Sequence, residues 1–83
     1  MALKNRDYYE NLFADYPDVL SSKLVAEMMG EISVGAVIKL LNQKHLKGIL
    51  YLDQKWLVPK KALIDYLLSP HYQSYKLLLS AQI

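Results

Sequence analysis

The sequence predicts a small α+β domain, mostly helical, in which three helices precede a β-hairpin and two helices follow it. Apolar residues recur at helical spacing in five segments of the chain. A short turn, Glu31-Ile32-Ser33, joins two of these segments, and two β-prone runs flank Asp53-Gln54. With 83 residues, the chain is expected to form one domain, residues 1–83.

The first half of the chain is expected to hold three helices. The segment 7–16, DYYENLFADY, carries aromatic and apolar side chains at helical spacing, and a proline ends it. Ser21 is a good N-cap for the next helix, which stops at Gly30. The third helix begins at the N-cap Ser33 and runs to about Lys44.

The second half is expected to hold a hairpin and two more helices. The runs ILYL and KWLV form the strands, with Trp56 packed on the helices and Lys55 facing outward. Pro59 opens the next helix, Ser69-Pro70 ends it, and the tail HYQSYKLLLSAQI is helical. This order of elements is that of a winged helix-turn-helix with a two-stranded wing and a helical extension at each end.

Charge is distributed unevenly along the chain, although the net charge is only +2. Residues 1–18 hold two cations against four carboxylates, which leaves −2. Residues 39–61 hold six lysines against Asp53 alone, which leaves +5. Such a cluster is typical of a protein that binds a polyanion, and it is equally typical of a lysine-rich face in contact with solvent.

Composition argues against several other classes of protein. There is no cysteine, so we expect neither disulfides nor a thiolate zinc site. No apolar run approaches the ~20 residues of a membrane span and no signal-peptide core is present, so we expect a cytoplasmic protein without membrane contact. His45 and His71 are expected to be separate surface side chains rather than metal ligands. We expect no catalytic residues, metal or cofactor, and therefore not an enzyme.

Three short motifs resemble a known family. Ile32-Ser33 precedes the third helix, Leu46-Lys47-Gly48 leads into the hairpin, and Trp56-Leu57-Val58-Pro59-Lys60 follows its turn. In this order they resemble the excisionase-like branch of the MerR-type winged helix-turn-helix family over residues 19–68, with residues 1–18 and 70–83 as extensions. The resemblance implies a small, non-enzymatic DNA-binding protein of a phage, plasmid or transposon, acting as an excisionase or a transcriptional regulator.

The residues that would read DNA depart from the pattern of that family. Gly35 and Ala36 stand where its recognition helix often carries arginine or polar residues, and Tyr51 stands at a position that is commonly basic. An arginine fork on a guanine edge contributes about 1–3 kcal/mol of discrimination, which these side chains do not supply. The side chains still expected to contact nucleic acid are Lys39, Asn42, Gln43, Lys47, Tyr51, Lys55, Lys60 and Lys61.

The tyrosines and small residues indicate a protein interface. Of the 7 tyrosines, five lie in the two extensions, and tyrosine is favoured at interfaces because its ring is buried while its hydroxyl stays hydrogen-bonded. We expect residues 1–18 to fold back on the core, and residues 70–83 to serve association with a partner or a second copy rather than folding. The expected interface residues are Gly35, Ala36, Ile38, Tyr72, Tyr75, Leu78 and Leu79.

Two functions remain open from the sequence. In the first, the chain is an accessory protein of mobile-element DNA replication or recombination. It docks on a larger protein, such as a polymerase, primase, helicase or recombinase, and contacts nucleic acid weakly and without sequence preference. In the second, it is a duplex-binding excisionase or transcriptional regulator. The bare first turn of the recognition helix favours the first function.

Overall fold

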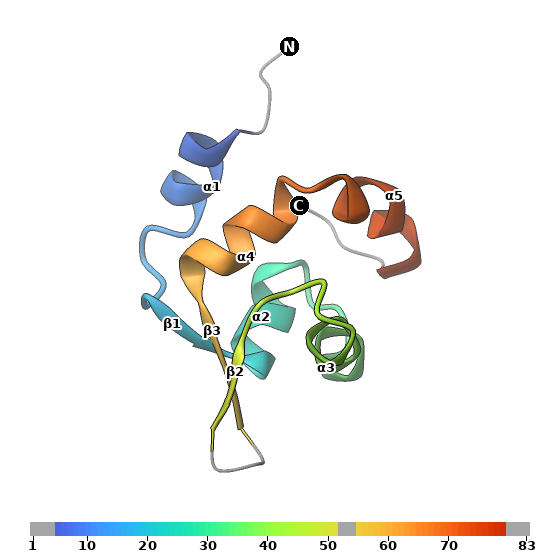
Figure 1. The fold of residues 1–83 in the computed structure, drawn as a ribbon. Helices are drawn as coiled ribbons and strands as arrows, with labels where there is room; N and C mark the ends of the chain where they lie inside the picture. Colours follow the sequence, from blue (N-terminus) through green and yellow to red (C-terminus); the bar gives the residue numbers. More distant parts are fainter. Residues whose placement is uncertain (1–4, 52–54, 80–83) are drawn as a thin grey trace.

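The fold is α+β and mostly helical, as the sequence predicts (Figure 1). A computed structural model describes residues 5–51 and 55–79, except for the side chain of Leu79. Within these residues the elements are α1 (Arg6–Leu12), β1 (Val19–Ser21), α2 (Ser22–Met28), α3 (Val34–Asn42), β2 (Ile49–Tyr51), β3 (Lys55–Pro59), α4 (Lys60–Leu67) and α5 (Pro70–Leu79). Their order is compatible with the predicted winged helix-turn-helix. None of the described helices is long and apolar enough to cross a bilayer.

The sheet has three antiparallel strands in the order β1-β3-β2. Strands β2 and β3 are the predicted hairpin, in which Leu50 pairs with Trp56. The expected turn residues Asp53 and Gln54 lie outside the described residues. Strand β1, in which Leu20 pairs with Val58, was not predicted. Three residues carry too little periodicity to indicate a strand, and β1 owes its conformation to pairing with a segment almost 40 positions away in the sequence.

Helices α2 and α3 follow each other across a short turn, and the predicted caps are present. The side chain of Ser21 accepts a hydrogen bond from the backbone N–H of Leu24, and that of Ser33 accepts one from Ala36, both at 3.1 Å. Gly30 follows the end of α2 with a φ of 97°, a conformation that favours glycine. These local signals position α3 against α2.

A single core lies between the inner face of the sheet and the helices. Leu20 and Val58 come from the sheet and are completely buried, together with Val25, Val37 and Leu63 from three helices. The other buried side chains among the described residues are Tyr9, Phe13, Ala26, Met28, Met29, Ile32, Leu40, Leu41, Leu46, Ile64, Tyr66, Leu67 and Tyr72. The core therefore includes residues from both extensions.

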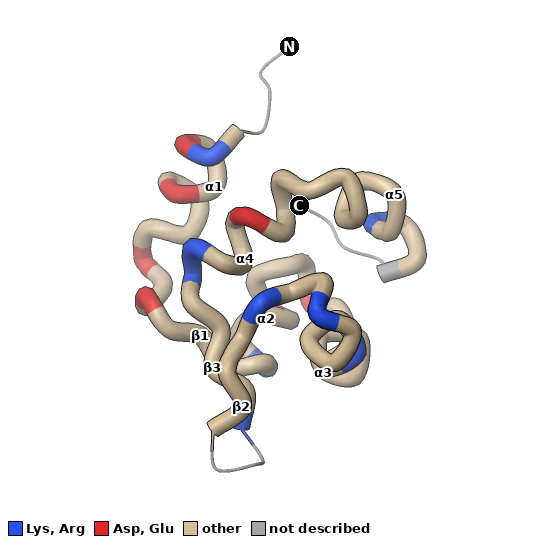
Figure 2. Tube along the Cα trace, in the orientation of Figure 1, with Lys and Arg blue, Asp and Glu red and all other residues tan. Residues whose placement is uncertain are grey.

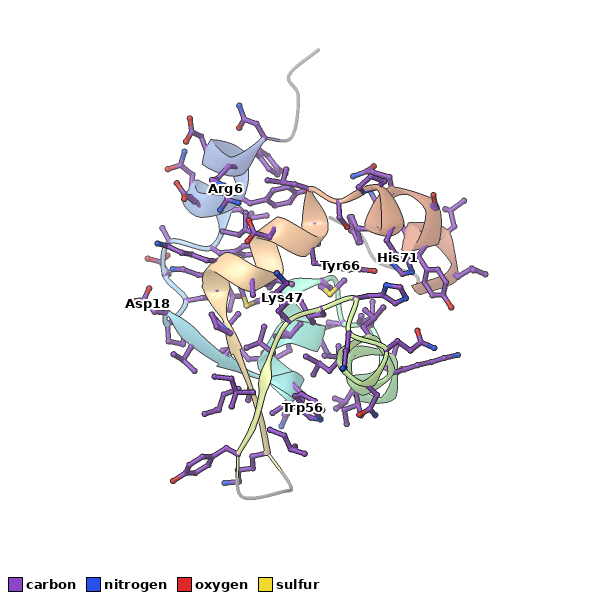
Figure 3. All side chains as sticks on the ribbon, in the orientation of Figure 1. Arg6, Asp18, Lys47, Trp56, Tyr66 and His71 are labelled. Carbon is purple, nitrogen blue, oxygen red and sulfur yellow. The ribbon has the colours of Figure 1, made fainter. Side chains whose placement is uncertain are left out.

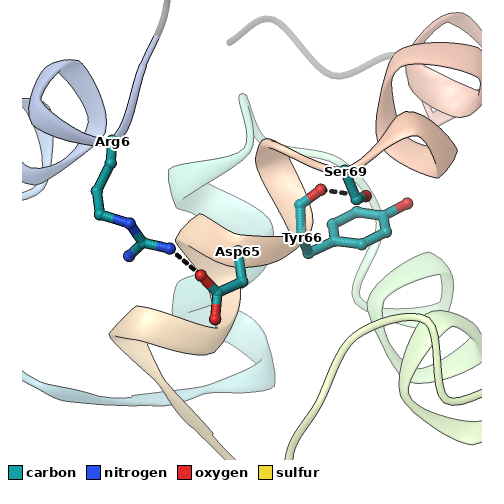
Figure 4. A network of polar contacts seen from close by, with 4 residues as sticks. All are labelled: Arg6, Asp65, Tyr66 and Ser69. Carbon is teal, nitrogen blue, oxygen red and sulfur yellow. Dashed lines mark hydrogen bonds and ion pairs between the residues drawn. The ribbon is translucent and has the colours of Figure 1, made fainter.

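The N-terminal extension folds back on α4, which confirms the prediction. Tyr9 and Phe13 are buried, and their rings stack with centroids 6.1 Å apart. At the other end of the contact, the guanidinium of Arg6 on α1 forms an ion pair with Asp65 on α4 (Figure 4). Both partners of this ion pair are partly exposed, so it contributes at most about 1 kcal/mol. The buried aromatic rings are the main reason that α1 packs where it does.

The C-terminal extension is also part of the fold, which corrects the expectation that it serves association alone. Tyr72 on α5 has no exposed surface and packs edge-on against Tyr66 of α4, with ring centroids 5.6 Å apart. The hydroxyl of Ser69 donates to the carbonyl of Tyr66 at the junction of the two helices (Figure 4). Because α4 ends in this way, α5 turns back over the core instead of extending into solvent (Figure 1).

Candidate nucleic-acid interface

The first turn of α3 carries no polar or charged side chain on its outward face. Val37, Leu40 and Leu41 point into the core, as the helical spacing predicts. Gly35 is exposed, and a Cβ added there would meet nothing closer than the hydroxyl of Ser33 at 4.0 Å. The polar side chains of α3 and its C-cap that reach solvent are Lys39, Asn42 and Gln43, one turn or more further along. In winged helix-turn-helix proteins that read DNA, the corresponding part of the recognition helix usually leaves the major groove.

Helix α5 lies beside α3 and forms a groove with it. We call this the α3–α5 groove; its volume is about 220 Å³. It is lined by Ala36, Lys39, Leu40, Gln43, Tyr75 and Leu78. Ala36 and the two α5 residues belong to the interface expected from the sequence, and the structure brings these three residues together in one concavity.

Two histidines, expected to be separate, stack on each other at the edge of this groove. The rings of His45, which follows α3, and His71 on α5 have centroids 3.7 Å apart and are inclined by 17°. Tyr75 continues the stack on the other side of His71, at 4.9 Å. Nδ1 of His71 also lies 3.0 Å from the hydroxyl of Tyr66 (Figure 3). This ring stack links the end of α3 to α5.

The same surroundings shift the acid–base equilibria of the stacked groups. Desolvation by the surrounding rings, together with the nearby His45, lowers the pKa of His71 below its ordinary value of 6.5. Burial, and to a smaller extent the nearby Tyr75, raises the pKa of Tyr66 to about 12. The neutral forms of both groups are therefore favoured in the folded protein.

The hairpin side of α3 holds a second groove of about 350 Å³. It is lined by Leu41, Lys44, Leu46, Lys47, Gly48 and Trp56. Trp56 packs against the core, as predicted, but remains partly exposed (Figure 3). A Cβ on Gly48 would lie 2.7 Å from the side chain of Leu41 and 3.2 Å from the carbonyl of Leu57. Glycine at this point therefore lets the hairpin approach α3 closely.

Lys60 does not belong to the candidate nucleic-acid surface, which corrects the prediction. Its ammonium donates to the carbonyl oxygens of Phe13 at 3.2 Å and Tyr16 at 3.0 Å, and Asp18 lies at 3.8 Å. Only 18% of its side chain is exposed. Lys60 thus satisfies carbonyl groups after the end of α1 and anchors the N-terminal extension.

Lys61 is exposed but lies apart from the surface formed by α3. It lines a third hollow, of about 540 Å³, together with Lys60, Pro59, Ile64, Glu10 and Asp18. Two carboxylates at this hollow reduce its attraction for a polyanion. Of the predicted nucleic-acid contacts, Lys39, Asn42, Gln43, Lys47, Tyr51 and Lys55 remain exposed around α3 and the hairpin.

The predicted partner interface is also corrected in part. Tyr72 is completely buried and so is not available to a partner. Leu78 is 77% exposed, whereas Tyr75 is half-buried in the ring stack. The side chain of Leu79 lies outside the described residues. Gly35 is exposed, and Ala36 and Ile38 are half-buried along α3.

Charged residues are unevenly distributed over the molecule (Figure 2). Carboxylates are concentrated on α1 and on the segment that leads to β1. Neither residues 32–52 nor residues 66–83 contain aspartate or glutamate. Both helices that line the α3–α5 groove come from these segments, so its charged side chains are cationic.

Comparisons with protein-family models, with curated proteins and with solved structures each find no match to this chain. The resemblance to the excisionase-like family therefore stays a prediction. No group of three or more potential metal ligands comes together among the described side chains.

Proposed function

We propose that this chain is a non-enzymatic winged-helix accessory protein of mobile-element DNA replication or recombination. It docks on a larger protein and contacts nucleic acid weakly, without reading its sequence. The observation that carries the proposal is the outward face of α3: its first turn presents Gly35 and Ala36, and an apolar groove lined by α5 runs beside it.

The absence of an available arginine supports weak and unspecific DNA binding. Arg6 is the only arginine in the sequence, and it is paired with Asp65 on the acidic side of the molecule. Bidentate arginine on guanine is the commonest specific contact in the major groove. The exposed lysines near α3 and the hairpin can neutralise phosphates, which supplies affinity but no sequence discrimination.

The mobile-element setting comes from the three motifs that resemble the excisionase-like family. A polymerase, primase, helicase or recombinase is the class of partner that such a protein would serve. A second copy of the chain is the other candidate partner. In either case the partner would supply the sequence or structure specificity that α3 lacks.

A duplex-binding excisionase or transcriptional regulator is the second candidate function. It is favoured by the exposed Lys39, Asn42 and Gln43 on one helix, because lysine can contact guanine, and asparagine or glutamine can contact adenine. Lys55 at the start of β3 is also exposed and suited to a phosphate contact from a wing.

The two functions differ in DNA affinity and in its dependence on sequence and salt. Fluorescence anisotropy with several unrelated duplexes should give dissociation constants of about 10⁻⁴–10⁻⁶ M at physiological salt, similar for every sequence. The double variant Lys39→Ala with Lys55→Ala should bind DNA more weakly. The slope of its log binding constant against log salt concentration should also be shallower, by about 0.9 for each phosphate that the variant no longer neutralises. Lys23→Ala, an exposed lysine of α2, is the matched control. Nanomolar binding to one duplex, retained over scrambled competitor DNA, would favour the second function.

A further inference from the structure

The α3–α5 groove has an apolar lining that is open to solvent. Ala36 and Leu40 line it from α3, and Tyr75 and Leu78 line it from α5. Leu78 is 77% exposed, and its neighbour Leu77 is 92% exposed. Exposed apolar side chains that border a concavity are typical of interaction sites.

The charged side chain that lines this groove is cationic. Lys39 lies at the groove itself, and Lys44 and His45 follow directly after α3. On the other wall, the cationic side chain of α5 is Lys76. Because the lining holds a lysine and no carboxylate, we expect a complementary surface to carry acidic groups.

The shape of the groove suits a helix better than a small ligand. At about 220 Å³, its volume lies below the range of about 300–1,000 Å³ that is usual for small-molecule pockets. It is bordered by helices of 9 and 10 residues, which are about 14–15 Å long. A groove of this kind takes a few apolar anchors spaced by three or four residues on an amphipathic helix. Gly35 and Ala36 leave room for the backbone of that helix to approach α3.

From these observations we infer that the α3–α5 groove docks an acidic amphipathic helix of the partner protein. Apolar side chains of that helix enter between Leu40, Tyr75 and Leu78, and its carboxylates face Lys39. The inference rests on the proposed function, which calls for a protein partner but does not state its chemistry. Nucleic acid fits the groove less well because four of its six lining residues are Ala36, Leu40, Tyr75 and Leu78, whose exposed surface is mainly apolar, and phosphate groups need polar donors.

A peptide-display experiment tests this inference without knowledge of the partner. A library of peptides of about 16 residues, between four and five helical turns, is selected for binding to the full-length protein. The enriched sequences should be rich in aspartate and glutamate, with apolar residues at i, i+3 or i+4, and i+7. Replacing the glutamates of a selected peptide by glutamine should lower its affinity at least about tenfold.

Two adjacent leucines provide a matched pair of variants. Leu78→Glu places a carboxylate in the groove lining, whereas Leu77→Glu makes the same change on the same helix at a position that does not line the groove. Both side chains are largely exposed, so both variants should fold, as checked by circular dichroism. Leu78→Glu should lower the affinity of the selected peptides at least about tenfold. Leu77→Glu should leave that affinity within a factor of about two of the unsubstituted protein.

Several outcomes would overturn the inference. Selected peptides that are basic or without helical spacing would do so, as would equal effects of the two leucine variants or no enrichment at all. If Leu78→Glu lowered the affinity for duplex or single-stranded DNA more than Leu77→Glu did, the groove would be a nucleic-acid site. In each case the proposed function stands if DNA binding remains weak and unspecific, because its own test is independent of the groove.

Discussion

Two glycines make opposite contributions to this molecule. Gly48 is surrounded, because an added Cβ would lie 2.7 Å from Leu41 and 3.2 Å from the carbonyl of Leu57. Gly35 faces open space on the first turn of α3. The first glycine is required for packing between the hairpin and α3, and the second only leaves the surface of α3 bare.

This contrast gives a prediction for the two alanine variants. Gly48→Ala should lower the free energy of unfolding by about 1–3 kcal/mol, because it overpacks a tight contact. Gly35→Ala should leave that free energy unchanged or raise it by up to about 1 kcal/mol, because alanine is the better helix former. Urea denaturation of both variants checks this. Equal stability of the two would show that the hairpin does not approach α3 as closely as described.

Lys60 gives a second prediction at the scale of one residue. Lys60→Met keeps the aliphatic stem but removes the ammonium donor from the carbonyl of Tyr16, whereas the carbonyl of Phe13 keeps the backbone N–H of Tyr16 at 3.0 Å. It should lower the free energy of unfolding by about 1–3 kcal/mol, the cost of leaving polar groups unsatisfied. Lys61→Met, at the exposed neighbouring position, should change it by less than about 0.5 kcal/mol. If DNA affinity fell in the Lys60 variant while stability did not, Lys60 would be a nucleic-acid contact after all.

Single residues were the hardest part to predict from the sequence. The spacing in α3 correctly gave Val37, Leu40 and Leu41 as its buried face, because helical periodicity is a local property. The stack of His45 on His71 and the contacts of Lys60 join positions 26 and more than 40 residues apart. A single sequence contains no local signal for such contacts.

At the scale of elements, α2, α3 and their caps were predicted well, whereas the first helix ends at Leu12 rather than near Tyr16, and strand β1 was missed. The N-caps Ser21 and Ser33 and the stop at Gly30 all act through neighbours within a few residues. Strand β1 depends on its distant pairing with β3, and the packing of α5 depends on the burial of Tyr72. An exposed tyrosine and a buried one give the same helical spacing, so the spacing alone could not show that the tail is part of the core.

The role of α5 gives a prediction for two truncations. Ending the chain after Ser69 removes Tyr72 from the core and should lower the free energy of unfolding by about 3–5 kcal/mol, as for other large aromatic truncations. Ending it after Lys76 keeps Tyr72 and Tyr75 and should have a much smaller effect. Denaturant melts of both chains, followed by circular dichroism, distinguish these results. A cooperative and unchanged melt of the shorter chain would show that α5 serves association only.

The histidine stack predicts that stability depends on pH. Because folding lowers the pKa of His71, the unfolded chain binds this proton more readily than the folded chain. The contribution of neutral His71 to the free energy of unfolding is therefore complete above its ordinary pKa of 6.5. This contribution is lost progressively as the pH falls from 6.5 toward the lowered pKa of the folded state. The melting temperature should decrease over this range. His71→Phe keeps a ring between His45 and Tyr75 without the titrating group, and a decrease that persisted unchanged in this variant would assign the effect to other groups.

At the scale of the whole molecule, the uneven distribution of charge was visible in the sequence and is present in the fold. Four of the seven described carboxylates lie on α1 and the segment after it, and carboxylate-free segments build α3, the start of the hairpin and α5 (Figure 2). What the sequence could not show is that α5 would lie beside α3. That arrangement joins a small-residue helix face and an apolar tail into one groove.

The proposed function depends above all on one property, which is that the face around α3 does not read a DNA sequence. Selection of bound duplexes from a random library, performed with the full-length protein at physiological salt, is the decisive measurement. We predict that no motif is enriched and that recovered duplexes bind no more tightly than the starting pool, with dissociation constants of about 10⁻⁴–10⁻⁶ M. A recurrent motif bound with a dissociation constant of about 10⁻⁸ M or lower, and no longer bound after substitution of Asn42 or Gln43, would contradict the proposal.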